Sequence, residues 1–301
     1  MAVVASYYLT PKPWAAILLR AERARAGVSN GQSVVEGRRI AYLERGGPAE
    51  PILFVHTFGG SSDDWVRFVA AFPASHRMIA IDLPAFGNST ALKDDAFDIE
   101  SQATHAWSIA RALGGRKLHL VGASMGGHIV AAMATQAPNA VVSITLIEPH
   151  GIKTDAPSTM DARIAHGEAP LVVRSNEAFD RLLSLTFVEK PFVPYPVLDH
   201  LRNREIECAK AYDAIWRTLL LERTALGARL EKLRMPMLGI WGDSNGVFHV
   251  QGADVARTHA PQIQTVIMRG VGHLPMIEKP AATAAIVASF LQSIEVRDTL
   301  D

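Results

Sequence analysis

Residues 118–127 have the sequence LHLVGASMGG, which is the strongest indication of the fold in this chain. An apolar run typical of a strand leads into Gly-x-Ser-x-Gly, and a helix of small residues is expected over 127–137. This order predicts a sharp turn with Ser124 at its apex, in a strained backbone conformation. Gly122 and Gly126 suit the turn because a Cβ at either position would strike the adjoining strand or helix. The serine hydroxyl would stand next to a helix N-terminus, whose N–H groups favour a developing negative charge.

The composition is that of a core-rich globular protein. The chain has 301 residues, of which 49% are apolar and 20% charged, a length that suits one large domain or a core with an insertion. Lys plus Arg and Asp plus Glu are both 30, so the formal net charge is zero and no nucleic-acid partner is expected. The single cysteine, Cys208, excludes an intramolecular disulfide and favours a reducing, cytoplasmic setting. Without clustered Cys and His ligands, neither a metal nor a cofactor is expected.

Apolar runs of strand length recur on both sides of the central stretch. Those runs are 52–55, 77–81, 117–121, 141–147, 237–241 and 263–268. Helical patterns separate them, which predicts a mostly parallel sheet covered by helices on both faces. Between the fourth and fifth run, strand alternation stops and several helical patterns follow. We therefore expect an N-terminal helical segment over 1–32, an α/β core over 33–151 and 228–301, and an inserted helical cap over 152–227.

The N-terminal segment holds a second helical pattern. Trp14, Ile17 and Leu18 share one face of a helix over 14–25, with arginines elsewhere on it. The apolar runs here fall short of the 18 or so residues that a membrane span needs, and no signal peptide is expected. This helix is expected to pack on the body of the protein; weak contact with a membrane surface through 14–25 is the alternative.

A serine at such a turn needs a base, and His273 is the candidate. It lies in Gly-Val-Gly-His-Leu-Pro, residues 270–275, just after the last predicted strand. Because ligands gather at the carboxyl ends of parallel strands, Ser124 and His273 are expected at the same edge of the sheet. His119 is expected to pack within a strand, and His128 to support the turn from the helix behind it.

An oxyanion formed at Ser124 needs two hydrogen-bond donors. One is expected to be the N–H of Met125, which directly follows the serine. The other is expected from the Gly-rich loop after the third strand, where His56 opens the sequence His-Thr-Phe-Gly-Gly. We assign the second donor to the N–H of Phe58, and expect His56 to hold the shape of that loop.

Four motifs, taken together and in order, resemble the α/β-hydrolase family over nearly the full length of the chain. They are HTFGG at 56–60, DLPAFGNS at 82–89, GASMGG at 122–127 and GHLPMIEKP at 272–280. The chain is most similar to the monoacylglycerol-lipase-like branch, which includes membrane-anchored eukaryotic acylglycerol lipases and small bacterial lipases and esterases; KPFVP at 190–194 and VQGAD at 250–254 also resemble it. The resemblance implies an α/β-hydrolase fold, with a mostly parallel central sheet flanked by helices and an inserted helical cap.

Two positions depart from the pattern of this family. Thr57 replaces the glycine that usually follows the histidine of the oxyanion loop. The family usually supplies the acid of its triad as Gly-x-x-Asp after the seventh strand, and here Asn245 stands at that position in Gly-Asp-Ser-Asn. An asparagine does not stabilise an imidazolium as a carboxylate does and favours the wrong tautomer; in serine proteases this exchange costs about 10⁴ in rate.

Three interpretations of the missing acid remain open. In the first, the acid is Glu148, which ends the strand before the cap, an arrangement similar to that of certain haloalkane dehalogenases. In the second, Asp243 reaches His273 through a shift of its loop. In the third, the triad is lost and the protein is a weak enzyme or a binder. The chain order of serine, acid and histidine fits either carboxylate.

The sequence therefore predicts a serine hydrolase of uncharged, short- to medium-chain acyl esters, acting through an acyl-enzyme without a cofactor. Alternatives on the same machinery are a carbon–carbon bond hydrolase and an amidase, and from another class a ligand-binding pseudo-hydrolase. The acyl pocket is expected to be lined by His56, Phe187, Phe192 and Trp216. The sequence makes no prediction of the oligomeric state.

Overall fold

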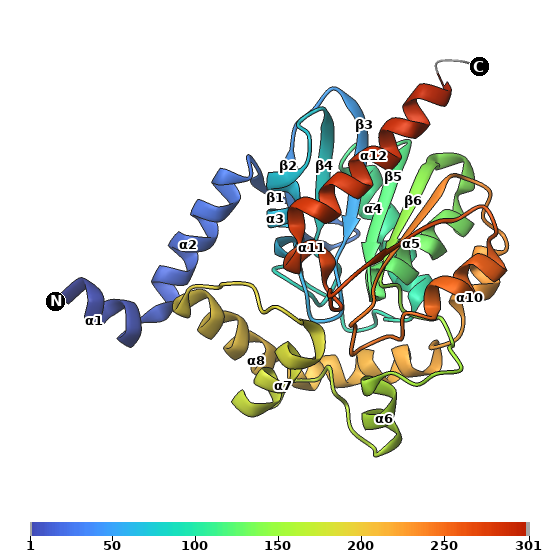
Figure 1. The fold of residues 1–301 in the computed structure, drawn as a ribbon. Helices are drawn as coiled ribbons and strands as arrows, with labels where there is room; N and C mark the ends of the chain where they lie inside the picture. The colour runs from blue at the N-terminus through green and yellow to red at the C-terminus, as the bar shows by residue number, and fades with distance from the viewer. Residues whose placement is uncertain (1, 299–301) are drawn as a thin grey trace.

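An eight-stranded sheet between two layers of helices forms the body of the protein, as a computed structural model that describes residues 2–298 shows (Figure 1). The strands are β1 (Ser29–Val35), β2 (Arg38–Arg45), β3 (Ala49–Val55), β4 (His76–Ile81), β5 (Leu118–Ala123), β6 (Val141–Ile147), β7 (Met237–Gly242) and β8 (Gln264–Met268). Their order across the sheet is β1-β2-β4-β3-β5-β6-β7-β8. The β1–β2 and β2–β4 pairs are antiparallel, and all other pairs are parallel. The predicted mostly parallel sheet is confirmed.

The helices that cover the sheet alternate with its strands. They are the 3-10 turn η1 (Ser62–Trp65), α3 (Val66–Ala71), α4 (Ile99–Ala112), α5 (Met125–Gln136), the 3-10 turn η2 (Pro138–Ala140), α10 (Gly252–His259), α11 (Pro275–Glu278) and α12 (Pro280–Asp298). Helices α4, α5 and α10 pack on one face of the sheet, and α3 and α12 on the other. Parallel strands joined by crossover helices must be covered on both faces, which explains why their sequences are continuous apolar runs.

Strand β5, at the centre of the sheet, shows how the two layers share one apolar run. Leu118 and Leu120 belong to the core under α4 and α5, whereas Val121 and Ala123 belong to the core under α3 and α12. The side chains alternate because successive residues of a strand point to opposite faces. All six residues of β5 are buried, so this strand holds the turn that follows it in a fixed place.

The segment between β6 and β7 forms helices and contributes no strand to the sheet. These helices are α6 (Thr159–Ala165), α7 (Asn176–Thr186), α8 (Tyr195–Leu221) and α9 (Leu226–Leu230). In Figure 1, α6, α7 and α8 lie together beyond one end of the sheet. Most of the predicted cap segment over 152–227 falls in these helices.

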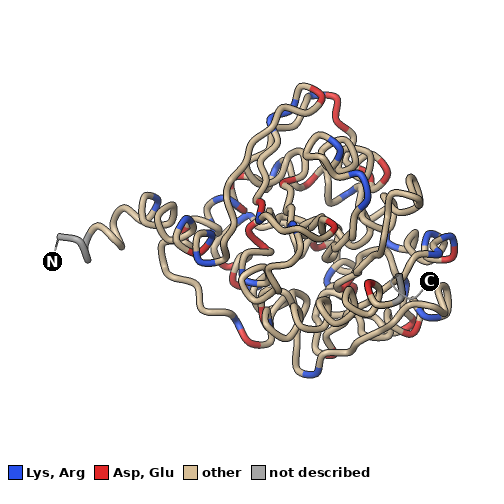
Figure 2. Tube along the Cα trace, turned by 90° about the horizontal axis from the view of Figure 1, so that it is seen from above, with Lys and Arg blue, Asp and Glu red and all other residues tan. Residues whose placement is uncertain are grey.

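The N-terminal helices α1 (Ala2–Leu9) and α2 (Pro11–Arg25) extend from the body of the protein, and α2 packs against α8 (Figure 1). Strand β1 begins at Ser29, four residues before residue 33, where the α/β core was expected to begin. Lys and Arg are interspersed with Asp and Glu over the trace (Figure 2). Within residues 2–298, no helix combines the length and the apolar character needed to cross a membrane.

Candidate active site

Ser124 sits at the apex of a tight turn between β5 and α5. Its backbone has φ 53° and ψ −119°, a region that residues other than glycine rarely adopt. The Ser124 N–H donates to the Ile147 carbonyl at 2.9 Å, and the Ser124 carbonyl accepts from the Gly127 N–H at 3.0 Å. The neighbouring strand and the first turn of α5 therefore hold the strained conformation from both sides.

The two glycines that flank the serine are required by close backbone packing. A Cβ on Gly122 would lie 2.2 Å from the Gly126 carbonyl oxygen. A Cβ on Gly126 would lie 2.2 Å from the carbonyl oxygen of Val55, at the end of β3. Both contacts are with backbone atoms, which cannot move aside as a flexible side chain can. The structure thus confirms the expected reason for Gly-x-Ser-x-Gly.

The N–H groups of Phe58 and Met125 donate no hydrogen bond to any residue within 2–298. Met125 opens α5, so its N–H is one of the unpaired donors at a helix N-terminus. His56 holds the loop of Phe58 in place: Nδ1 bonds the Thr57 carbonyl at 2.7 Å, and Nε2 accepts from the Leu83 N–H at 3.1 Å. Because Nε2 accepts, Nδ1 carries the proton, so the ring is fully used in shaping the loop.

His273 lies in the loop after β8, is 3% exposed, and is fixed through its own backbone and the residue before it. Its N–H donates to the carbonyl of Thr186, at the end of α7, at 2.7 Å. The Gly272 N–H donates to the carboxylate of Glu278 at 3.0 Å. Burial, with a smaller contribution from the nearby His150 ring, lowers the pKa of His273 to about 3. The imidazole is therefore neutral at pH 7 and able to accept a proton.

The side chain next to His273 is Asn245. Its Nδ2 lies 3.1 Å from His273 Nδ1. Its Oδ1 accepts from the backbone N–H groups of Val247 at 2.7 Å and Phe248 at 3.2 Å. Two backbone donors can bond only the oxygen of the amide, so the NH₂ group must face the histidine. His273 Nδ1 is then an acceptor in this arrangement, and the ring proton is on Nε2.

Glu148 is fully buried behind Asn245, at the end of β6. It has a φ of 46°, and its Oε1 accepts from the backbone N–H of Gly242. Its Oε2 has no hydrogen-bond partner of ordinary geometry among residues 2–298. Burial raises the pKa of Glu148 well above its usual value, and the Gly242 N–H and the Asn245 amide offset part of this effect by favouring the carboxylate. Asn245 thus lies between Glu148 and His273, and the first interpretation of the acid remains a prediction.

Asp243 points away from the histidine. Asp243 is exposed, and its Oδ1 accepts from the Gly270 N–H at 2.7 Å and from Ser244 Oγ at 2.9 Å. These bonds close the turn after β7 onto the turn after β8. The alternative that Asp243 reaches His273 is therefore corrected, because its carboxylate is engaged on the outer side of the loop.

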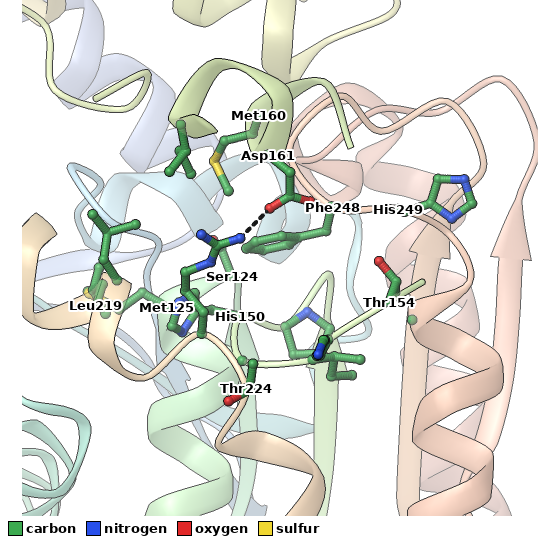
Figure 3. A pocket seen from close by; sticks show the side chains of 18 of the residues that line it. Ser124, Met125, His150, Thr154, Met160, Asp161, Leu219, Thr224, Phe248 and His249 are labelled. Carbon is green, nitrogen blue, oxygen red and sulfur yellow. Dashed lines mark hydrogen bonds and ion pairs between the residues drawn. The ribbon is translucent and has the colours of Figure 1, made fainter. Parts of the chain in front are cut away.

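A cavity of about 490 Å³ opens above Ser124, within the range of small-molecule sites. The expected donors Phe58 and Met125 and the cap residue Trp216 line it, together with His150. Figure 3 labels Met125 and His150 among the side chains around the cavity. Much of its wall is apolar and comes from α6 and α8. At its rim, Arg223 on the chain after α8 pairs with Asp161 of α6 at 2.7 Å.

Three of the four residues expected in the pocket do not line this cavity. His56 is fully buried in the loop that it shapes. Phe187 follows the carbonyl that binds His273, and its backbone packs against Gly272. Phe192 is 83% exposed. The expectation is corrected for all three, because His56 is engaged within its own loop, and neither Phe187 nor Phe192, on the chain after α7, lines the cavity.

His150 is the cavity residue that reasoning from the sequence missed. It is 8% exposed and follows Glu148 by two positions. Its N–H donates to the Ser124 carbonyl at 3.0 Å, so the loop after β6 is tied to the serine turn. The signal that could have identified His150 is its position at the carboxyl end of a parallel strand, where ligands bind. The sequence analysis applied this criterion only to His273.

Comparisons with known proteins agree with this geometry. The sequence profile of the alpha/beta hydrolase fold family matches residues 50–170. Lipase 1 of Psychrobacter immobilis is 28% identical, with 88% of this chain and 84% of that protein covered. Monoacylglycerol lipase ABHD6 of Mus musculus is 27% identical, with 99% and 93% covered.

Among solved structures, this chain is similar to a membrane phospholipase A described as a bacterial virulence factor. The TM-score is 0.92 at 34% identity, over 98% of this chain and 95% of the other. A lipase from Acinetobacter baumannii AYE has a TM-score of 0.88 at 24% identity, over 94% and 97% of the two chains, and supports the fold alone.

Proposed function

The chain belongs to the α/β-hydrolase family and is an ester hydrolase of the lipase and esterase type, and we propose that it cleaves uncharged carboxylic esters with short to medium acyl chains through an acyl-enzyme. The observation that carries this proposal is the strained Ser124 at the base of a largely apolar cavity, beside two N–H groups that donate to no residue within the described range 2–298.

In acylation, Ser124 Oγ attacks the ester carbonyl carbon while His273 Nε2 takes the serine proton. The N–H groups of Phe58 and Met125 hold the oxyanion, and such donors are worth 10² to 10³ in rate. His273 then gives the proton to the departing alcohol oxygen as the carbon–oxygen bond breaks. In deacylation, His273 deprotonates a water molecule, which releases the acid and restores Ser124.

This mechanism needs the His273 proton on Nδ1, so that Nε2 is free to accept. The tautomer that Asn245 favours has the opposite arrangement. We assign the selection of the reactive tautomer to Glu148, a buried carboxyl group beside the Asn245 amide, whose Oε2 has no hydrogen-bond partner of ordinary geometry among residues 2–298. The carboxylate of Glu148 would stabilise the imidazolium that forms when Nε2 takes the serine proton.

The relatives suggest which esters to test. The name of one solved neighbour specifies a phospholipase A and that of one relative a monoacylglycerol lipase. A panel of p-nitrophenyl acetate, butyrate and octanoate with a monoacylglycerol and a phospholipid separates chain length from the alcohol part. Because the cavity wall is apolar, we expect a higher kcat/KM for p-nitrophenyl butyrate and octanoate than for p-nitrophenyl acetate.

The test is hydrolysis of p-nitrophenyl butyrate by wild type and Ser124→Ala, with labelling by a fluorophosphonate probe. The wild-type protein should be labelled by the probe and should hydrolyse the ester, and Ser124→Ala should do neither. Equal hydrolysis by both proteins would falsify the proposal. An unlabelled wild-type serine would instead favour a ligand-binding pseudo-hydrolase, which the Asn245–His273 contact makes the second candidate.

We also propose a cytoplasmic protein with weak contact to membrane surfaces through 14–25. Ile17 on α2 is 54% exposed, and Lys and Arg lie along the same helix (Figure 2). Basic and apolar side chains on one helix suit an anionic lipid surface. Sedimentation with anionic vesicles, compared between wild type and Ile17→Glu, tests this contact.

A further inference from the structure

Thr57 stands where the α/β-hydrolase family usually has a glycine, and the hydrolytic mechanism gives its side chain no role. The residue is 8% exposed and does not line the cavity above Ser124. Its backbone φ is negative, so the conformation at this position does not require glycine. A threonine can therefore form side-chain contacts here that a glycine lacks, and it does so without backbone strain.

The carbonyl of Thr57 and the N–H of Phe58 belong to one peptide unit. A trans peptide unit is planar, and its carbonyl and N–H point in opposite directions. The Thr57 carbonyl accepts from His56 Nδ1 at 2.7 Å and from the Gly60 N–H at 3.1 Å. These two bonds turn the Phe58 N–H away from His56 and Gly60. The direction of this oxyanion donor is thus set through the position of Thr57.

The carboxylate of Asp64 fixes the other polar groups of Thr57. Asp64 Oδ2 accepts from Thr57 Oγ1 at 3.0 Å and from the Thr57 N–H at 3.4 Å. The pKa of Asp64 is raised to about 6, mainly by burial, and the two bonds from Thr57 offset part of this effect. At pH 7 the group is therefore mainly a carboxylate, which has only acceptors, so the Thr57 hydroxyl is the donor. Every polar group of Thr57 is then engaged.

Asp64 lies in the 3-10 turn η1, which the core of the protein holds in place. Its N–H donates to the Ser61 carbonyl at 3.0 Å. The next residue, Trp65, is fully buried, and its ring centroid lies 4.9 Å from that of Phe54 and 5.8 Å from that of Phe68. Phe54 belongs to β3, so the carboxylate is fixed relative to the central sheet.

Gly60 leaves the space that the Thr57–Asp64 pair occupies. A Cβ on Gly60 would lie 2.6 Å from Thr57 Oγ1 and closer still to Asp64 Oδ2. The Phe58 side chain contacts the cap instead, since its ring centroid lies 5.3 Å from that of Tyr212 on α8. The oxyanion loop is therefore held by the Thr57–Asp64 pair on the core and by an aromatic contact on the cap.

We propose that Thr57 and Asp64 are positioning residues of the oxyanion hole: Asp64 holds Thr57, and Thr57 directs the Phe58 N–H toward the carbonyl oxygen of the ester. This inference rests on the proposed ester hydrolysis and adds two residues to it. Neither side chain lines the cavity, so both act through the backbone of Phe58. An oxyanion donor acts mainly in the transition state, so loosening Thr57 lowers the rate of the chemical step and leaves binding of the ester unchanged.

The kinetic test measures hydrolysis of p-nitrophenyl butyrate at pH 7 by wild type and three variants of Thr57. Thr57→Val keeps the shape of the side chain without the hydroxyl, and it should lower kcat about tenfold while KM stays within about twofold. Thr57→Ser keeps the hydroxyl and should stay within about threefold of the wild-type kcat. Thr57→Gly, which introduces the usual residue of the family, should be at least as slow as Thr57→Val. A Thr57→Val protein with the wild-type kcat, or with a change in KM alone, would overturn the proposal.

Asp64→Ala tests the other half of the pair, and Asp63→Asn is its matched control. Asp63 is the neighbouring carboxylate in η1, and it pairs with Arg23 of α2 at 2.6 Å instead of with the loop. Asp64→Ala should lower kcat as Thr57→Val does, and Asp63→Asn should not. The double variant of Thr57→Val and Asp64→Ala should be no slower than the slower single variant, because both changes remove the same contact. Losses that multiply in the double variant would overturn the pair.

A second measurement does not depend on hydrolysis. Amide NMR of nitrogen-15-labelled Ser124→Ala protein observes the Phe58 N–H directly. Adding Asp64→Ala should shift or broaden the Phe58 signal, although the two residues are not sequence neighbours, and adding Asp63→Asn should leave it in place. If wild type hydrolyses the ester no faster than Ser124→Ala, the proposed function is wrong; a Phe58 signal moved by Asp64→Ala then still supports the pair as what positions this N–H, and an unmoved signal overturns it.

Discussion

Asn245 donates to His273 from the position at which a triad carboxylate would accept. The amide nitrogen lies 3.1 Å from His273 Nδ1, and the amide oxygen is held by the N–H groups of Val247 and Phe248. A carboxylate could accept from the same two backbone groups and from the histidine at once. An amide cannot, because its nitrogen brings a donor to the ring. The loop thus keeps the geometry of an acid site while its hydrogen bond runs in the opposite direction.

The fully buried Glu148 behind this pair provides the first prediction. Glu148→Gln should lower kcat on p-nitrophenyl butyrate at least 100-fold, because no carboxylate would then hold the reactive tautomer or stabilise the imidazolium. Adding Asn245→Asp to this variant should recover at least tenfold, since the new carboxylate would contact His273 Nδ1 directly. Stopped-flow acylation rates for both variants measure this step.

Asp243→Asn is the matched control, because its carboxylate bonds Gly270 on the outer side of the loop. It should retain the wild-type rate within threefold. A Glu148→Gln protein as fast as wild type would remove Glu148 from the mechanism. A double variant no faster than Glu148→Gln would show that a carboxylate at position 245 does not act on His273.

The cap wall of the cavity provides the second prediction, on chain length. Ile164, on α6, lines the cavity, and a larger ring there would fill part of its apolar space. Ile164→Trp should lower kcat/KM for p-nitrophenyl octanoate about tenfold relative to acetate, and Ile164→Leu, which conserves volume, should not. An unchanged octanoate-to-acetate ratio in Ile164→Trp would place the acyl chain elsewhere.

Local rules made the sheet and the serine turn predictable. The glycines around Ser124 are dictated by contacts within a few residues, and the strands by continuous apolar runs. The position of Asn245 near His273 also followed from motif order. Strand β1 began earlier than expected because its first residues, from Ser29, are polar and exposed at the sheet edge, where no apolar alternation marks them.

The lining of the cavity was less predictable, because a cap segment can turn its aromatic side chains inward or outward. Phe192 is exposed and Trp216 is buried, although both are aromatic residues of the same segment. The contact between Arg229 and His128 could not be predicted from the spacing of residues in the sequence. Arg229 lies 101 positions from His128, and only the folded chain brings them together. Such long-range polar contacts leave no periodic signal in a sequence.

Glu205, on α8, provides the third prediction, on stability against pH. Its pKa is raised to about 8, mainly by burial; Arg204 offsets part of the effect of burial, and Asp64 adds to it. Between pH 4.5 and 8 the unfolded chain loses this proton while the folded chain keeps it. Stability should therefore fall as the pH rises through this window, by at most about 1.4 kcal/mol per pH unit. Glu205→Gln cannot ionise, so its Tm should exceed that of wild type more at pH 8 than at pH 5.

Glu207→Gln is the control for Glu205, because it changes an exposed carboxylate on the same helix. Its Tm difference from wild type should be the same at both pH values. Thermal melts at pH 5 and pH 8 for the three proteins are sufficient. If Glu205→Gln behaved like the control, Glu205 would be ionised in the folded protein.

The contact between Gly126 and β3 provides the last prediction. A Cβ on Gly126 would lie 2.2 Å from the Val55 carbonyl oxygen, a backbone atom at the end of β3. Gly126→Ala must push α5 away from β3 and should destabilise the fold by about 3 kcal/mol or more. Gly46→Ala is the matched control, since apart from its chain neighbours no described residue has an atom within 4 Å of the added Cβ, and its backbone needs no positive φ. Urea denaturation should separate the two variants by more than 2 kcal/mol. Equal midpoints would mean that the turn tolerates a side chain at Gly126, and that the small residues around Ser124 are not required for packing.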